Sequence, residues 1–216
     1  MEALSVACDV DPGTAARSAL YRLLAEVLAF PDGLAPAVAD GGLRAALASW
    51  SAALPYALPP PPDALADPAA ADDALAADYI RLFDVGVGGP PCPLHGGVYQ
   101  GDRMRTMEEA TRFYHFFGLR LAPPLRELPD HVTTELEFLH YLTFREIQTR
   151  AAGGDPTPLL RAQRDFLARH PCTWMPRMAQ RLARQEAQPF YPALVGWALD
   201  FLHADAAWAA ARAEAD

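Results

Sequence analysis

The spacing of apolar side chains along this chain follows the period of an α-helix and not that of a β-strand. Near the start of the chain, apolar residues recur at intervals of three and four, which places them on one face of a helix. Thr14 is expected to cap this helix, and Pro31 ends it after about Phe30. Its apolar face comprises Leu20, Leu23, Leu24, Val27 and Leu28.

The same period continues through most of the chain. It predicts helices over 43–54, from Asp72 or Asp73 to Phe83, and then over 103–117, 130–152, 158–169, 171–185 and about 192–210. Neither a useful run of strand-like alternation nor an internal repeat interrupts them. The pattern therefore predicts an all-α fold, a single-domain bundle of about eight helices over residues 1–216.

Two segments break the helical pattern and are expected to connect helices. Residues 55–71 are rich in proline, which lacks a backbone donor and cannot continue a helix. Residues 84–102 are rich in glycine and proline, and loops longer than about 12–15 residues are usually functional or disordered. Because the second loop also holds Tyr99 and several valines, we expect it to be ordered. Such connections also allow a domain-swapped dimer as well as a monomer.

Charge and composition exclude several classes of function. The net charge of -9 argues against a nucleic-acid partner and is compatible with a basic peptide. All basic residues are arginine, so neither Schiff-base chemistry nor a phosphate-binding loop with its lysine is expected. The cysteines Cys8, Cys92 and Cys172 form no CxxC motif and predict free thiols in a reducing compartment. With neither a secretory signal nor a membrane span in view, we expect a cytoplasmic protein.

Polar residues gather at the start of the fifth predicted helix. Asp130 is placed to accept N–H bonds from the first turn, and its charge suits the positive end of the helix dipole. His131 and Glu135 share one helix face, where an imidazolium–carboxylate pair can form. A well-capped helix with a surface ion pair explains the same residues, so both interpretations stay open.

Candidate metal sites are incomplete in the sequence. Glu137 and His140 form one ExxH motif, whereas a di-iron bundle needs two such motifs and two further glutamates. The pairs Cys92/His95 and His170/Cys172 suggest zinc, but the second spacing is tight for a structural site. No nucleophile motif or dinucleotide fingerprint is present either. We expect no enzyme activity, metal or cofactor, and keep a helical, di-iron-like redox enzyme as the alternative.

Four segments in register resemble the TorD/DmsD/NarJ family of molybdoenzyme chaperones. Tyr79-Ile-Arg-Leu-Phe83 resembles the family's Y-x-x-L-F, and Pro90 to Tyr99 resembles a segment that ends in S/G-V-Y. Glu127-Leu-Pro-Asp-His131 is similar to E-P-x-D-H, with Leu128 where many members have proline. Phe166 to Trp174 resembles F-L-x-x-H-L-x-x-W, with Pro171 in place of leucine. The loop and Tyr99 to Met104 further resemble the branch that serves type II dimethyl sulfoxide reductase-family enzymes.

This resemblance implies an all-helical chaperone without chemistry of its own. Its implied partners are the apo catalytic subunit of a bis-molybdopterin guanine dinucleotide oxidoreductase and that subunit's twin-arginine leader peptide. A peptide that is basic at one end and apolar in the middle needs an apolar groove rimmed with carboxylates. We expect Asp130, His131 and Glu135 to rim this groove. The complete set of candidate partner-binding residues is Tyr79, Phe83, Pro93, Tyr99, Glu127, Asp130, His131 and Glu135.

Overall fold

The computed structural model describes residues 11–67, 69–120 and 127–215, and over these residues the chain is helical without a β-strand. Ten α-helices are present in this part of the chain, of which α2 and α5 have only five and four residues. The predicted all-α fold is confirmed. The helices are α1 (Pro12–Val27), α2 (Ala35–Ala39), α3 (Gly42–Ala52), α4 (Asp72–Tyr79), α5 (Gly97–Gln100), α6 (Arg103–Phe116), α7 (Val132–Ala151), α8 (Thr157–Arg169), α9 (Pro171–Leu182) and α10 (Phe190–Ala215).

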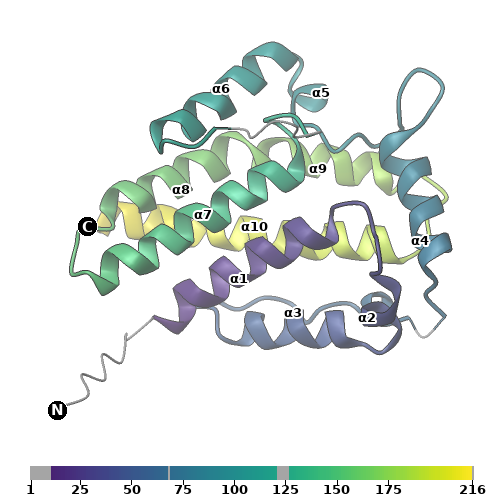
Figure 1. The fold of residues 1–216 in the computed structure, drawn as a ribbon, viewed down its shortest axis with the longest axis horizontal. Helices are drawn as coiled ribbons and strands as arrows, with labels where there is room; N and C mark the ends of the chain where they lie inside the picture. Colours follow the sequence, from purple (N-terminus) through teal and green to yellow (C-terminus); the bar gives the residue numbers. More distant parts are fainter. Residues whose placement is uncertain (1–10, 68, 121–126, 216) are drawn as a thin grey trace.

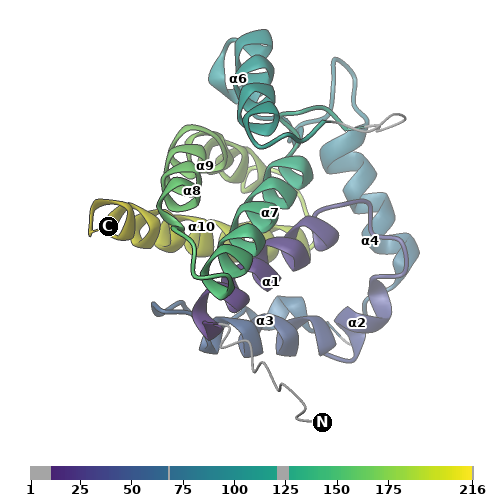
Figure 2. The same ribbon diagram turned by 60° about the vertical axis from the view of Figure 1, so that its left-hand side comes forward.

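The long helices pack side by side around one hydrophobic cluster. Helix α1 lies along α7, and α10 lies along α8 and α9, as Figure 1 shows. The short α2 and the longer α3 lie beside α1 on the side away from α8, and α6 stands outside the layer next to α8 (Figure 2). None of the described helices is long and apolar enough to cross a membrane.

Helix α1 starts earlier than its sequence pattern predicted. Asp11 is its N-cap, and its carboxylate accepts hydrogen bonds from the backbone N (2.9 Å) and the hydroxyl (2.6 Å) of Thr14. Pro12 follows at the first helical position, where its missing N–H leaves no partner unsatisfied. Thr14 is therefore a partner of the cap and not the cap itself.

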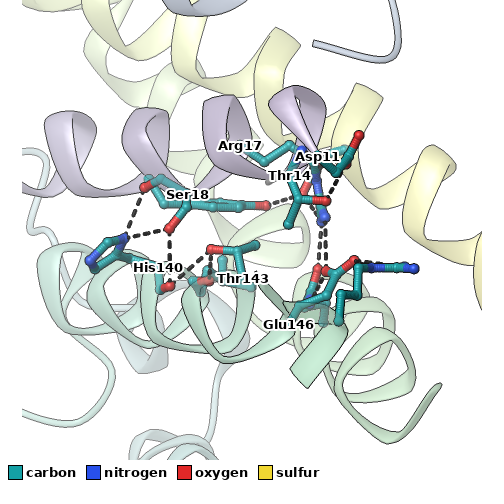
Figure 3. A network of polar contacts seen from close by, with 12 residues as sticks. Asp11, Thr14, Arg17, Ser18, His140, Thr143 and Glu146 are labelled. Carbon is teal, nitrogen blue, oxygen red and sulfur yellow. Dashed lines mark hydrogen bonds and ion pairs between the residues drawn. The ribbon is translucent and has the colours of Figure 1, made fainter. Parts of the chain in front are cut away.

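Buried polar residues join four helices at the centre of the bundle. The Arg17 guanidinium of α1 donates to Asp205 Oδ1 on α10 (2.5 Å) and to Gln163 Oε1 on α8 (2.6 Å). It also lies 3.4 Å from Glu146 Oε2 on α7, and both side chains are fully buried (Figure 3). Since a buried charge is costly unless it is paired and hydrogen-bonded, this network holds the four helices in one relative position.

The two predicted connections contain short helical pieces. Residues 55–71 hold a 3-10 turn at Asp63–Leu65 in the described part of the segment, and are otherwise irregular. A π-helical turn at Ile80–Asp84 directly extends α4 and ends at the first residue of the second connection. The last residues of this connection include α5, so the loop is partly helical as well as ordered. This second connection approaches the start of α7, where the polar residues of interest lie.

Candidate functional site

Backbone hydrogen bonds join the loop before α5 to the residues that open α7. The N–H of Gly96 donates to the carbonyl of Asp130 (2.8 Å), and the N–H of Val132 donates to the carbonyl of Leu94 (2.9 Å). These bonds make an isolated antiparallel bridge between His95 and His131. Two segments far apart in sequence are thus fixed next to each other at one end of the bundle.

Asp130 lies beneath this junction and is fully buried. Its Oδ2 accepts a hydrogen bond from the N–H of Gly97 (2.9 Å), and its Oδ1 lies 3.5 Å from Nδ1 of His95. Burial alone would raise the pKa of Asp130, but the interactions with His95 and Gly97 hold it below its ordinary value. The carboxylate therefore stays charged and anchors the loop.

The predicted cap of α7 is wrong by one residue. His131 is the N-cap, and its Nδ1 accepts a hydrogen bond from the N–H of Thr133 (3.3 Å). Asp130 cannot perform this role because its carboxylate instead accepts a hydrogen bond from the backbone N–H of Gly97, in the glycine-rich connection of residues 84–102 (the glycine loop). The competing partner, Gly97, is 33 residues away in sequence, so no local pattern at the helix start could reveal it.

The predicted pair of His131 and Glu135 is also wrong. Glu135 is fully buried, and its Oε2 accepts a hydrogen bond from Nε1 of Trp174 on α9 (2.9 Å). Its Oε1 lies 3.7 Å from Nδ1 of His170, and burial raises the pKa of Glu135 well above its ordinary value. The Nε2 of His131 instead lies 3.5 Å from Oε2 of Glu127.

Tyr99 and Pro93 are buried in the packing that supports the loop. The Tyr99 ring stacks on Trp174 with a centroid distance of 5.6 Å, and the guanidinium of Arg181 lies 4.7 Å from its centroid. Its backbone carbonyl accepts a hydrogen bond from Arg177 (2.5 Å). The loop is therefore held to α9 as well as to α7.

A groove with a volume of about 720 Å³ opens beside the junction. Its walls come from the end of α1, the end of α4 with the following π-helical turn, the glycine loop and the start of α7. The aromatic rings are close together, with 5.6 Å between the centroids of Phe30 and Tyr79 and 5.2 Å between those of Tyr79 and Phe83. Its lining residues are Ala25, Glu26, Ala29, Phe30, Tyr79, Phe83, Asp84, Leu94, His95, Glu127, His131, Thr133 and Glu137.

The charge of this groove is negative. Four carboxylates line it and are exposed to solvent, namely Glu26, Asp84, Glu127 and Glu137. Burial and the neighbouring His95 lower the pKa of His131 to about 4, so its imidazole is neutral at pH 7. The groove thus combines an aromatic surface with an acidic rim and can take a ligand that is both apolar and basic.

The structure divides the predicted site residues into two groups. Tyr79, Phe83, Glu127 and His131 line the groove. Asp130 and Glu135 are sealed beneath it, which corrects the prediction that they form its rim, and Pro93 and Tyr99 are also outside the lining. These four buried residues support the loop and the start of α7.

Sequence reasoning missed three of the four carboxylates of the acidic rim and one aromatic residue. Glu26 and Asp84 come from helix ends that the sequence did not connect with the polar cluster. Phe30 is 51% exposed although it closes an apolar helix pattern, and an apolar residue just before Pro31 was the signal available for it. Glu137 was considered only as a possible metal ligand.

The histidine of the ExxH motif joins two helices. Nδ1 of His140 lies 2.9 Å from the hydroxyl of Ser18 and 2.9 Å from its carbonyl, which joins α7 to α1 (Figure 3). Glu137, the other member of the motif, lines the groove. Likewise, Cys172 donates to the carbonyl of Leu202 (3.6 Å), and His170 is buried beside Glu135.

Comparison with known proteins matches the part of the chain that supplies the groove residues from Tyr79 to Glu137, but the family model does not extend to the end of α1. A family model described as "Nitrate reductase delta subunit" matches residues 37–180. The perchlorate reductase assembly chaperone protein of Dechloromonas aromatica is 32% identical over 199 residues, which cover 88% of this chain and 88% of that protein.

Shorter matches have higher identity. The chlorate reductase assembly chaperone protein of Ideonella dechloratans is 41% identical over 124 residues, covering 56% of this chain and 64% of that protein. The selenate reductase assembly chaperone protein of Thauera selenatis is 41% identical over 120 residues, which cover 55% of this chain and 62% of that protein. These matches span less than two thirds of either relative.

A solved structure shares the fold. It is a protein from Archaeoglobus fulgidus assigned to redox enzyme maturation, with a TM-score of 0.50 and 18% identity. The alignment covers 89% of this chain and 92% of that one. Its low identity limits this likeness to the arrangement of helices.

Proposed function

Since this chain belongs to the nitrate reductase delta subunit family, that of the TorD/NarJ-type chaperones, we propose that it is an assembly chaperone for the catalytic subunit of a molybdenum oxidoreductase. The family model matches residues 37–180, and four relatives that serve chlorate, selenate, perchlorate and dimethyl sulfide enzymes are named as assembly chaperones. These names support the chaperone function over a helical redox enzyme. The client belongs to the type II dimethyl sulfoxide reductase-family enzymes.

The acidic groove is the observation that carries this proposal. A twin-arginine leader peptide presents two guanidinium groups followed by an apolar stretch. The carboxylates of Glu26, Asp84, Glu127 and Glu137 suit the guanidinium groups, and the rings of Phe30, Tyr79 and Phe83 suit the apolar stretch. The complementary charges favour capture of the peptide and disfavour acidic segments.

In this proposal the chain acts by binding alone. It holds the apo catalytic subunit in the cytoplasm while bis-molybdopterin guanine dinucleotide is inserted, and covering the leader delays export until insertion is complete. The His140 contact with Ser18 supports this view, because it gives the histidine of the ExxH motif a packing role.

Calorimetric titration with a synthetic twin-arginine leader peptide tests the proposal. The experiment is done in the presence of a chelator, so that metal ions make no contribution. Glu26→Gln, Glu127→Gln and Glu137→Gln each remove one exposed carboxylate of the rim and are expected to weaken binding up to about fivefold. Phe30→Ala removes an exposed ring and is expected to weaken binding without changing the fold.

Asp200→Asn is the matched control, because Asp200 is exposed on α10 and does not line the groove. Its affinity for the peptide is expected to equal that of the parent chain. Equal affinity of the parent chain and a variant with all three glutamine substitutions would reject the groove as the binding site. Absence of binding to the leader peptides of molybdenum oxidoreductases would reject the leader as the ligand.

A further inference from the structure

Three side chains of the groove converge in a way that peptide binding does not explain. His95 comes from the glycine loop, Glu127 from the segment before α7, and His131 from the cap of that helix. Each offers one potential ligand atom, and these atoms all lie within 4.8 Å of one another. We propose that His95, Glu127 and His131 form a binding site for a divalent transition-metal ion, with Zn²⁺ as the ion that fits it.

The spacing of the ligand atoms suits a tetrahedral ion. Zinc lies about 2.0–2.1 Å from histidine nitrogen and carboxylate oxygen, so two ligands at tetrahedral corners are separated by about 3.4 Å. The Nε2 of His131 and Oε2 of Glu127 are already 3.5 Å apart. This pair requires almost no movement to hold an ion.

His131 also has the outer partner that a zinc-binding histidine needs. Its Nδ1 lies 2.7 Å from the hydroxyl of Thr133, a buried residue of the first turn of α7. When Nε2 binds the ion, Nδ1 carries the proton and donates it to this hydroxyl in place of accepting the N–H of Thr133, which fixes the tautomer and the ring orientation.

His95 has a corresponding outer partner in Asp130. Its Nδ1 lies 3.5 Å from Oδ1 of Asp130, and neither of these buried atoms has a hydrogen-bond partner among the described residues. Asp130 is itself fixed through its other oxygen by the N–H of Gly97. A carboxylate that orients Nδ1–H of a histidine leaves Nε2 as the ligand, which is the usual arrangement around zinc.

The scaffold fixes both histidines, and Glu127 can move to close the site. The bridge between His95 and His131 holds their rings with a centroid distance of 4.9 Å. The side chain of Glu127 is 47% exposed and free to shift toward an ion. All three residues line the groove, so the fourth coordination position faces it and is open to water.

The donor set selects the class of ion. Two imidazoles and one carboxylate suit Zn²⁺ and its neighbours, whereas Ca²⁺ and Mg²⁺ prefer oxygen ligands alone. An ion here would also reduce the negative charge of the rim next to His131. The inference is independent of leader binding, since it concerns the isolated chain and a metal ion.

Titration of the metal-stripped full chain with Zn²⁺ tests the site, with Co²⁺ as a spectroscopic probe. We expect one ion per chain and the intense visible absorption of tetrahedral Co²⁺. His95→Ala and Glu127→Gln are expected to lower affinity by more than about 100-fold, since they remove ligands. Thr133→Val, which removes only the outer partner of His131, is expected to lower affinity by about 10- to 100-fold.

Asp200→Asn and His203→Ala are matched controls, because both residues are exposed on α10 and lie outside both the groove and the cluster of three. Both variants are expected to bind the ion as the parent chain does. Unchanged affinity in Glu127→Gln and His95→Ala, or equal losses in the controls, would overturn the proposal, as would an absence of stoichiometric binding. Because Glu127 is exposed, its variant keeps the test decisive even if His95→Ala, which removes a neighbour of buried Asp130, fails to fold.

Discussion

Gly97 shows how one small residue permits the junction under the groove. A Cβ atom added to it would lie 2.7 Å from the Cα of Arg103 and 2.9 Å from Oδ2 of Asp130. Real Cβ atoms do not approach other atoms so closely, and the first of these neighbours is backbone. A side chain at this position must therefore displace α5 from the start of α6 and disturb its contact with Asp130.

We expect Gly97→Ala to lower the free energy of unfolding by about 1–3 kcal/mol through this overpacking. Gly196→Ala is the control, because Gly196 lies within α10 and an added Cβ meets no atom within 4 Å. That variant should gain about 0.5–1 kcal/mol, since alanine favours a helix interior. Urea unfolding followed by circular dichroism measures both, and equal changes would contradict the overpacking.

His170 makes the stability of the protein depend on pH. It is fully buried between the ring of Phe166 on α8, the ring of Phe113 on α6 and Oε1 of Glu135 on α7. Burial, followed by the charge of Arg169, lowers the pKa of His170 to about 4. Between about pH 6.5 and pH 4, His170 is therefore mostly neutral in the folded chain, whereas it is mostly protonated in the unfolded chain.

Because the pKa of His170 is lower in the folded chain than in the unfolded chain, we expect the free energy of unfolding to decrease as the pH falls from about 6.5 to 4. His170→Gln removes the titrating group, so between pH 7 and pH 4 the parent should lose up to about 3 kcal/mol more than the variant. His131, with a pKa lowered in the same direction, and Glu135, whose raised pKa acts in the opposite sense, are present in both proteins. Parallel stability curves in urea unfolding at several pH values would contradict the assignment to His170.

At the scale of elements, the buried network of Arg17 decides how α1 sits on α7, α8 and α10. Its guanidinium contacts Asp205, Gln163 and Glu146, one from each of the other three helices. Tyr56, in the proline-rich connection, also donates to Asp205 (2.6 Å). The network therefore orders that connection as well as the helices.

Arg17→Met should cost about 3–5 kcal/mol, because it leaves buried carboxylates without a compensating charge. Arg22→Met is the control on the same helix, since Arg22 pairs with Glu26 at the surface and is 68% exposed. The control should change the free energy of unfolding by less than about 1 kcal/mol. Thermal and urea unfolding compare the two, and similar losses would show that the buried network adds no more than a surface pair.

At the scale of the whole molecule, charge favours a basic partner. The net charge is -9, and four of the carboxylates that contribute to it lie together at the groove. Long-range attraction of this kind mainly raises the association rate and is screened by salt. The net charge of the molecule and the carboxylates of the groove therefore both attract a basic peptide.

The association rate of a twin-arginine leader peptide should fall steeply as salt increases from about 0.05 to 0.5 M, with a smaller change in the dissociation rate. Stopped-flow fluorescence with a labelled peptide measures both rates. A peptide with its two arginines replaced by glutamine is the control and should show a weaker dependence on salt. A dependence confined to the dissociation rate would contradict steering by charge.

Local sequence determined the class of fold and most helix positions. Repeats such as Leu20, Leu24 and Leu28 place one apolar face on a helix whatever its neighbours are, so the helical period could be predicted without tertiary knowledge. The polar residues Glu127 and His131 also pointed to the end of the bundle at which the groove opens. The motifs correctly indicated the family as well.

The tertiary structure decided which polar residues line the groove and which are buried beneath it. Asp130 and His131 are adjacent in sequence, yet Asp130 is buried beneath the groove and His131 lines it, because Gly97 becomes a partner of the Asp130 carboxylate only after the helices pack. The rim and the three possible metal ligands likewise arise from segments brought together by folding. The period of a helix depends on residues that are close in sequence, so the sequence alone predicts it. A binding site depends on residues that are far apart in sequence and come into contact only when the helices pack.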